Sequence, residues 1–434
     1  MSNPIHSTSA KSVLPMLAMR GLATGLCAGY VVGLLRLSHD RAAARVALWL
    51  EEWREVWWTV PIWFGVLVAL AVILRRIVRE EPLISGSGIP QTELALAGRL
   101  SFTWWRVLLA KFLGSWLALF GGLALGREGP SIQMGGAVGA GFHALWRPAA
   151  PHALTGSPYV VAGAVAGLAA AFGAPAAGVL FAFEEMKSRR DTSLIVAACA
   201  SAIGAHLMIR IVFGMGRILP FAGFEAPPLS SFWIVALEGA VFGVLGVGYN
   251  KTLLWLHDRE AGQTLIPDRW RALPPLLLAG CLALFAPLLI GGGESLIIFV
   301  GEHDVALKTL ILLLAFKYLF AQYSTVASIP GGLLMPILCL GALGGRLWAE
   351  LPVSALAAHG LASGSVQPYV LFGMVSYFAA TVRAPLTGIV LVTEMSGTYT
   401  CLPGSLLAGL IACKVANLLH CPPVYDSLKE RIRL

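Results

Sequence analysis

The sequence predicts an all-α integral membrane protein built from two related halves. The chain of 434 residues is 57% hydrophobic and only 12% charged, whereas about a quarter of the residues in soluble domains are charged. It contains 48 glycines, about half again the usual share, which suits helices that pack closely in lipid. In addition, Gly/Pro motifs recur along the chain at a nearly constant spacing.

The first half contains several apolar runs, of which the longer ones can cross a membrane. An aromatic stretch at 41–58 separates the first two runs and is expected to lie at the membrane interface. Lys111 lies well inside the third run, and a lysine at that depth is expected to face protein rather than lipid. The runs are residues 13–37, 61–74, 104–125, 159–183 (interrupted at Pro175) and 194–213.

The second half follows a proline-rich stretch at 221–231, the most loop-like part of the chain. Several of its apolar runs are short or broken by proline, which predicts partial or re-entrant helices. We predict a single transmembrane domain over 1–434, with repeat halves at about 13–220 and 230–425 and short tails at 1–12 and 426–434. The apolar runs are residues 232–256, 273–290, 310–320, 332–348, 369–393 and 402–419.

The two halves share an ordered set of motifs. Residues 126–130 (Gly-Arg-Glu-Gly-Pro) and 332–336 (Gly-Leu-Leu-Met-Pro) both have the form G-x-x-x-P and start 206 positions apart. In each half, glycines stand five and nine residues after the motif proline. Further on, the Ala-Pro, Gly and Glu of 174–184 recur 210 positions later at 384–394. Repeated halves with broken helices are typical of transporters, whose substrate site lies at the repeat interface.

Three Gly/Pro turns each begin a helix inside an apolar region. The first amides of such a helix have no partner within it, and together with the positive end of the helix dipole they attract an anion. Glu128 lies on the central turn, next to Arg127, and can compete with a diffusible anion. The glycines and prolines of the three turns are Gly86, Gly88, Pro90, Gly126, Gly129, Pro130, Gly332 and Pro336.

The net charge of +8 comes from 31 basic and 23 acidic residues, and the basic ones gather at the ends of apolar runs. This distribution is typical of cytoplasmic span ends, so it explains the charge without nucleic acid or a lipid-surface role. It predicts a multi-pass membrane protein with both termini cytoplasmic. The basic residues used are Lys11, Arg20, Arg75, Arg76, Arg79, Lys187, Arg189, Arg190, Lys429, Arg431 and Arg433.

No catalytic or metal-binding pattern is visible. The seven cysteines lack C-x-x-C spacing and are expected to be free, buried thiols. The sequence has no H-E-x-x-H motif and no paired nucleophile and base, which disfavours a membrane-embedded enzyme. We therefore expect neither a metal nor another cofactor.

The motifs G-S-G-I-P at 86–90, G-R-E-G-P and G-x-x-x-P, in this order, resemble those of the CLC family of chloride channels and proton/chloride antiporters. The resemblance extends over about residues 13–425. It implies a fold of two inverted-topology repeats with many tilted, broken and re-entrant helices. It also implies a homodimer with one pathway per subunit, in a bacterial-type inner (plasma) membrane. The chain ends nine residues after Tyr425, so no cytoplasmic regulatory domains are expected.

The resemblance also implies roles for single residues. The hydroxyls of Ser87 and Tyr425 and the amides of Leu333 and Leu334 would bind chloride, and Glu128 would be the outer glutamate that moves and takes up a proton. The family usually has Phe where this chain has Leu334, which preserves the amide but not the packing of the ring. Serine at position 87 also argues against the fluoride-exporting branch of the family.

Glu185 matches the inner glutamate of proton-coupled members of the family. From the residues alone it can equally be a helix-end charge beside Lys187. With the resemblance, we expect a proton-coupled chloride antiporter that carries chloride and protons between the two sides of a lipid membrane. The alternative is a passive, voltage-gated chloride channel, in which chloride moves without protons.

Overall fold

The computed structural model describes residues 5–53, 56, 58–188, 191–221, 224–358 and 366–432; Arg189, Arg190 and Arg433, used above, lie outside them. Within these ranges the chain is helical, apart from an isolated antiparallel bridge between Gly126 and Gly332. The α-helices are α1 (Ile5–Trp53), α2 (Thr59–Glu80), α3 (Ile89–Leu96), α4 (Trp104–Phe120), α5 (Glu128–Trp146), α6 (Pro158–Phe172), α7 (Pro175–Glu184), α8 (Thr192–Leu207), α9 (Phe232–Gly262), α10 (Leu273–Phe285), α11 (Glu294–Glu302), α12 (Leu307–Val326), α13 (Leu334–Trp348), α14 (Ser354–Ala358), α15 (Gln367–Val382), α16 (Pro385–Ser396), α17 (Leu402–Leu418) and α18 (Val424–Lys429). Short 3₁₀ or π turns are η1 (Pro82–Ile84), η2 (Met208–Val212), η3 (Leu229–Ser231), η4 (Asp268–Trp270), η5 (Pro287–Leu289), η6 (Ala349–Val353) and η7 (Tyr399–Cys401).

The described residues include seven helical stretches that are long and apolar enough to cross a membrane. Others, such as α6, α7 and α16, are apolar but shorter, and each begins at a proline. Long and partial helices together confirm the predicted all-α membrane fold with broken helices. The seven stretches are Leu14–Val46, Thr59–Glu80, Thr192–Val212, Leu229–Gly262, Leu307–Val326, Leu334–Ala357 and Tyr399–Leu418.

One local expectation was wrong, and another stays a prediction. Helix α1 continues into the 41–58 stretch as far as Trp53, and the place of this stretch at the membrane interface stays a prediction. The cysteines are all free, as predicted, but Cys27, Cys199 and Cys281 are exposed rather than buried. In a membrane protein an apolar run does not imply an interior position, since the outer face of a helix is apolar as well.

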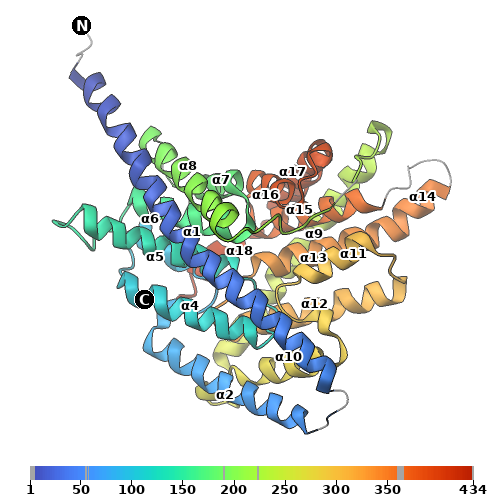
Figure 1. The fold of residues 1–434 in the computed structure, drawn as a ribbon. Coiled ribbons are helices and arrows are strands. Elements are labelled where there is room, and N and C mark those ends of the chain that lie inside the picture. The colour runs from blue at the N-terminus through green and yellow to red at the C-terminus, as the bar shows by residue number, and fades with distance from the viewer. Residues whose placement is uncertain are drawn as a thin grey trace.

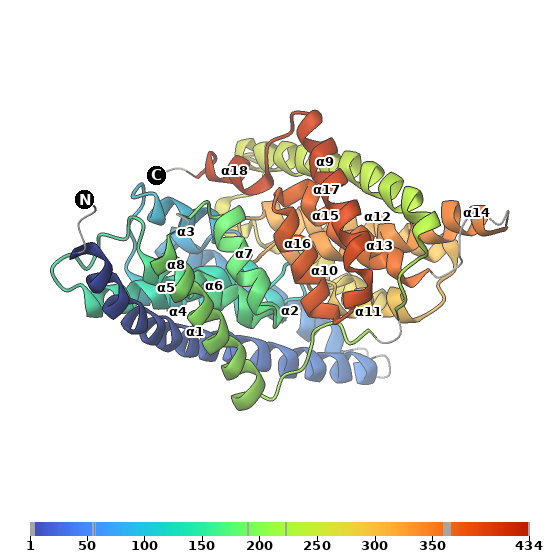
Figure 2. The same cartoon turned by 90° about the horizontal axis from the view of Figure 1, so that it is seen from above.

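The two halves lie side by side and repeat the same helix contacts (Figures 1 and 2). Helix α5 packs on α6 as α13 packs on α15, α1 packs on α8 as α9 packs on α17, and α4 meets α5 as α12 meets α13. The last helix, α18, returns to the first half and packs on α3. This arrangement brings the end of the chain next to its first Gly/Pro turn.

Glycine permits the close approach of equivalent helices. A Cβ atom on Gly135 of α5 would lie 2.9 Å from the carbonyl carbon of Gly163 in α6. A Cβ atom on Gly341 of α13 would lie 2.5 Å from the carbonyl oxygen of Gly373 in α15. Both distances are too short for a side chain. Gly135 and Gly341 stand five residues after the motif prolines, so these positions of the repeat are fixed by packing.

Helices α7 and α16 cap each other where the two halves meet. The Glu184 carboxylate at the end of α7 accepts hydrogen bonds from the amide of Thr387 at 2.6 Å and from its hydroxyl at 2.8 Å, at the start of α16. In return, the Glu394 carboxylate near the end of α16 accepts a hydrogen bond from the amide of Ala177 in α7 at 2.9 Å. Each carboxylate therefore meets the positive end of the other helix.

Candidate functional site

The three Gly/Pro turns meet at one place. The amide of Gly126 donates to the carbonyl of Gly332 at 2.6 Å, and the amide of Gly332 donates to the carbonyl of Gly126 at 2.7 Å. The amide of Gly331 donates to the carbonyl of Gly86 at 3.0 Å. These bonds connect turns that are more than 200 residues apart in sequence, and they place the starts of α3, α5 and α13 around a common point.

The turns require glycine for two reasons. Some positions have positive φ angles, and others have no room for a side chain. Gly86 and Gly88 have positive φ angles of 64° and 92°, a conformation that glycine adopts without strain. Gly129 has no room for a side chain, since a Cβ there would lie 2.9 Å from the Ser87 carbonyl oxygen and 3.1 Å from the Gly332 Cα. The predicted convergence of the three motifs is therefore a feature of the fold.

Lys111 holds the first turn. Its side chain is fully buried, and its ammonium group donates to the carbonyls of Ile84 at 2.8 Å and Gly86 at 2.7 Å. The expectation that this lysine faces protein rather than lipid is confirmed. A buried ammonium group needs such acceptors, so Lys111 and the Gly86 turn stabilise each other.

A second, equivalent loop was missed by the sequence analysis. Lys317 donates to the carbonyl of Gly291 at 2.7 Å, as Lys111 donates to Gly86. Gly291 and Gly293 have positive φ angles of 66° and 104°, close to those of the first turn. The signal was present, because Lys317 follows Lys111 by the same 206 positions as the G-x-x-x-P motifs. This loop precedes α11, a short helix that no apolar run had indicated.

Two hydroxyl groups face the meeting point of the turns. Ser87 and Tyr425 are both buried, and among the described residues neither hydroxyl makes a hydrogen bond of normal geometry. They nevertheless lie close enough to interact with each other. Buried hydroxyls without a protein partner are uncommon and are available as donors to a ligand.

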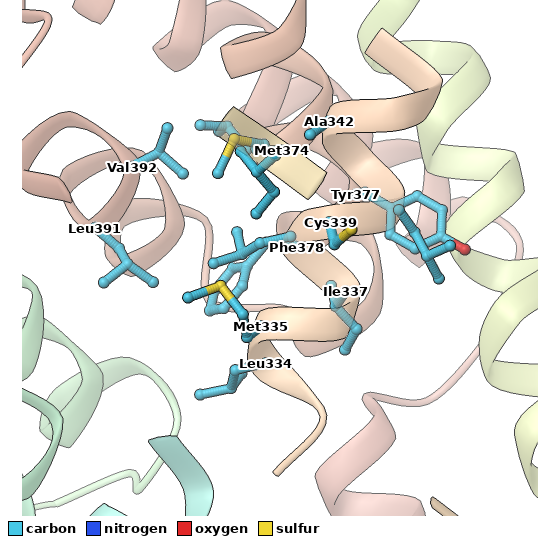
Figure 3. Packing of buried hydrophobic residues seen from close by; sticks show 14 of the residues in the cluster. Leu334, Met335, Ile337, Cys339, Ala342, Met374, Tyr377, Phe378, Leu391 and Val392 are labelled. Carbon is cyan, nitrogen blue, oxygen red and sulfur yellow. The ribbon is translucent and has the colours of Figure 1, made fainter. Parts of the chain in front are cut away.

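Leu333 and Leu334 begin α13, so their amides lie at the helix start and have no intrahelical acceptor. Their side chains are buried. Figure 3 shows Leu334 and Met335 at the beginning of the helix, with Phe378 of α15 nearby. An aliphatic side chain therefore occupies the position where the resemblance implies an aromatic ring.

Glu128 lies between these turns and a cavity. It is the first residue of α5, is almost fully buried, and lines a cavity of about 500 Å³ together with Arg127, Glu294 and Met335. Its carboxylate folds back toward Gly126, where a Cβ would lie 3.2 Å from the Glu128 carboxyl carbon. A rotation of this side chain would move its charge between the turns and the cavity.

Arg127 is clamped between carboxylates from both halves. Its guanidinium pairs with Asp40 of α1 at 2.8 Å and with Glu294 of α11 at 2.9 Å, and only 6% of its side chain is exposed. We call Asp40, Arg127 and Glu294 the outer clamp. Arg36 of α1 is also buried and interacts electrostatically with Glu128. Asp40 and Arg36 lie within α1 and Glu294 begins α11, and none of the three belongs to the Gly/Pro motifs seen in the sequence.

Glu185 lies in a different charge environment. It caps the end of α7, is buried, and interacts electrostatically with Glu93 and Lys429, whereas Glu128 interacts with Arg127 and Glu294. Tyr425, at the start of α18, interacts with both carboxylates. Ser87, Glu128, Glu185 and Tyr425 are therefore near one another, and the start of α13 with Leu334 is joined to the same turns.

Comparisons with known proteins identify relatives of this chain. A family model described as "Voltage gated chloride channel" matches residues 64–417. The H(+)/Cl(-) exchange transporter ClcA of Vibrio campbellii is 35% identical over 97% of this chain and 89% of its own length. The ClcA exchanger of Klebsiella pneumoniae is 31% identical, over 97% of this chain and 89% of its own length.

Solved structures show the same architecture. The crystal structure of a slow cyanobacterial Cl-/H+ antiporter has a TM-score of 0.87 and 28% identity, covering 95% of this chain and 97% of its own. A eukaryotic CLC transporter has a TM-score of 0.76 at 22% identity, covering 96% of this chain and 74% of its own. The second likeness concerns the fold alone.

Proposed function

This chain belongs to the voltage-gated chloride channel family, and we propose that it exchanges chloride for protons across a membrane. The observation that carries the proposal is the position of Glu128, a buried carboxylate between an open cavity and three converging helix starts. Its relatives from Vibrio campbellii and Klebsiella pneumoniae are named H(+)/Cl(-) exchange transporters, which favours exchange over passive conduction.

We propose that chloride binds where the turns meet. The donors would be the amides of Leu333 and Leu334 and the hydroxyls of Ser87 and Tyr425. None of these groups carries a full positive charge. Partial charges are sufficient to replace the hydration of a small anion, and they are weak enough to let it leave. The same donors would accept the carboxylate of Glu128 in place of chloride.

Competition between carboxylate and chloride then couples the two fluxes. Ionised Glu128 occupies an anion position and blocks it, whereas protonated Glu128 has lost its charge and yields to chloride. Glu185 passes protons between the cytoplasm and Glu128, along a route that includes the surroundings of Tyr425. The carboxyl group of Glu128 thus controls the binding of chloride, the uptake of the proton and the conformational state of the protein.

We further propose the setting of this activity. The protein is a homodimer with one pathway per subunit, in a bacterial-type inner membrane with both termini cytoplasmic, so the cavity beside Glu128 opens to the outside. It acts as a transporter rather than an enzyme and needs no cofactor. The relatives named above, which are transporters, support this proposal.

The test is a coupled-flux assay on the reconstituted protein. Proteoliposomes with an outward chloride gradient, clamped in voltage by a potassium ionophore, are expected to take up protons against their own gradient. Glu128→Gln and Glu185→Gln should reduce proton uptake at least tenfold while chloride still moves. Glu302→Gln, an exposed acid on α11, is the control and should behave as the wild type. Chloride flux without any uphill proton movement in the wild type would instead establish the passive channel.

A further inference from the structure

Four charged side chains form a continuous chain of ion pairs beside Glu185. Asp426 pairs with Lys187 at 2.8 Å and with Lys429 at 3.1 Å, and Lys429 also contacts Glu93. We call Glu93, Lys187, Asp426 and Lys429 the inner clasp. In the sequence, Lys429 indicated only membrane orientation, and Lys187 also appeared as a charged neighbour of Glu185.

The inner clasp joins three separate parts of the site. Glu93 is on α3, the helix that begins two residues after Ser87. Lys187 lies two residues beyond Glu185, just after the end of α7. Asp426 directly follows Tyr425, and Lys429 is the last residue of the same helix, α18. The clasp therefore connects the segments that carry the inner hydroxyl donors and the proton-accepting glutamate.

Helix α18 depends on contacts with its neighbours. It has only six residues, and isolated helices shorter than about 12 residues are marginal in water. Its orientation comes from packing on α3, α9 and α15, from the ion pairs of the clasp, and from the pair of Arg431 with Asp258 of α9 at 2.8 Å. Because Tyr425 is on the first turn of α18, whatever holds α18 also holds the Tyr425 hydroxyl near Ser87.

The Lys429–Glu93 pair is the most buried link of the clasp. The Glu93 side chain is 6% exposed and that of Lys429 is 21% exposed. An unpaired carboxylate at such a position is strongly unfavourable, so loss of the lysine would force Glu93 to take up a proton or admit water. Lys187 cannot replace it, because Lys187 pairs with Asp426 at a more exposed position.

We propose that Lys429 is a positioning residue that holds Tyr425 against the inner side of the anion site. The inner clasp thereby keeps chloride from passing without proton movement. This inference rests on the proposed function, since coupling has meaning only if the protein exchanges chloride for protons. In this proposal Lys429 contacts neither chloride nor the transported proton, and it acts by holding α18 in place.

The two ion pairs of Asp426 do not depend on pH near neutrality. Partial burial opposes ionisation of Asp426, but hydrogen bonds from Lys187 and Lys429 outweigh it and hold the pKa of Asp426 below its usual value. A depressed pKa means that the stabilisation is present above the unfolded-state pKa and is lost only as pH falls through the lower, folded-state value. The links of Asp426 to Lys187 and Lys429 are therefore kept at neutral pH.

The experiment measures the ratio of chloride to proton flux in proteoliposomes. Lys429→Met is expected to raise this ratio at least twofold by increasing chloride movement, and Lys429→Arg, which keeps the ion pairs, should restore it. Glu93→Gln breaks the same pair from the other side and should raise the ratio as well. The Lys429→Met/Glu93→Gln double variant should add little to either single change. Lys251→Met, at an exposed position on α9 without an ion pair, is the matched control.

Several results would overturn the inference. The inference is wrong if Lys429→Met and Glu93→Gln both keep the wild-type ratio of chloride to proton flux. It is also wrong if Lys429→Arg raises this ratio as much as Lys429→Met does. If Lys429→Met does not fold, as judged by size-exclusion chromatography, the ratio of Glu93→Gln decides. Failure of the proposed function is distinguishable, because the wild type itself would then move no protons uphill.

Discussion

At the scale of single residues, the site depends on ordinary side chains whose backbone neighbours are unusual. Ser87 lies between two glycines with positive φ angles, and Glu128 begins a helix that starts at a glycine-containing turn. Neither residue type alone indicates anion binding. The surrounding turns give these side chains their significance, because the turns leave amides and hydroxyls without internal partners.

Ser87→Ala is expected to weaken chloride binding about tenfold, since a hydrogen bond to a charged group contributes about 1.5–3 kcal/mol. Isothermal titration of the detergent-solubilised protein with chloride measures the change. Ser201→Ala is the control, because the Ser201 hydroxyl bonds to the carbonyl of Ala162 at 2.7 Å, away from the turns. An unchanged dissociation constant for chloride in Ser87→Ala would remove this hydroxyl from the proposed site.

Much of the site could be predicted from sequence because its parts are repeated turns. The three motifs are visible as Gly and Pro residues that interrupt the apolar sequence. Lys111 and Glu128 are visible as charged residues in apolar surroundings. Ion pairs between distant helices, such as that of Arg127 with Glu294, leave no such mark, since either partner reads as a helix-end charge. The orientation of α18 was equally hidden, because tertiary contacts rather than local pattern decide it.

At the scale of helices, mutual capping of α7 and α16 is the clearest consequence of the repeat. Glu184 and Glu394 stand 210 positions apart and make the same kind of contact in opposite directions. The sequence showed both as matching residues without a stated purpose. In the structure, each carboxylate accepts hydrogen bonds from amides at the start of a helix that begins with proline.

Glu184→Ala and Glu394→Ala should each destabilise the protein by about 1 kcal/mol, the usual loss for a helix cap. The two contacts lie at Ala177 and Glu184 of α7, roughly 11 Å apart at 1.5 Å per residue, so their effects should add. Thermal unfolding in detergent measures the changes, with Glu302→Ala as the exposed control. A double variant no less stable than the singles would show that the caps form one unit rather than two.

At the scale of the whole molecule, ion pairs between the two halves flank the site on two sides. The outer clamp joins α1 and α5 to α11 of the second half, and the inner clasp joins α3 and the end of α7 to α18. The charges of the clasp act on Glu185, and those of Arg127 and Glu294 in the clamp act on Glu128. Each carboxylate in the proposed proton route is thus next to a charge network that includes both halves.

The outer clamp should control how strongly the cavity attracts chloride. Arg127 lines this cavity, and the carboxylates of Asp40 and Glu294 offset its charge. Glu294→Gln removes one negative charge and leaves more of the guanidinium field for an entering anion. The interaction of an entering chloride with one charge that lines the cavity is worth about 1 kcal/mol at a solvated site. The outside chloride concentration for half-maximal exchange should therefore fall about threefold to fivefold. Flux measurements with chloride varied on one side at a time provide the test.

The change in half-saturating chloride concentration should occur only on the outside of the membrane. Removing a positive charge should shift this concentration in the opposite direction from removing a negative charge. Arg127→Gln should raise the outside half-saturating concentration, and neither variant should change the inside one, because the cavity is proposed to open only to the outside. High salt should reduce both shifts by screening the partly exposed carboxylates. Equal shifts on both sides would mean that the clamp acts by deforming the central turns, and the electrostatic account would then be wrong.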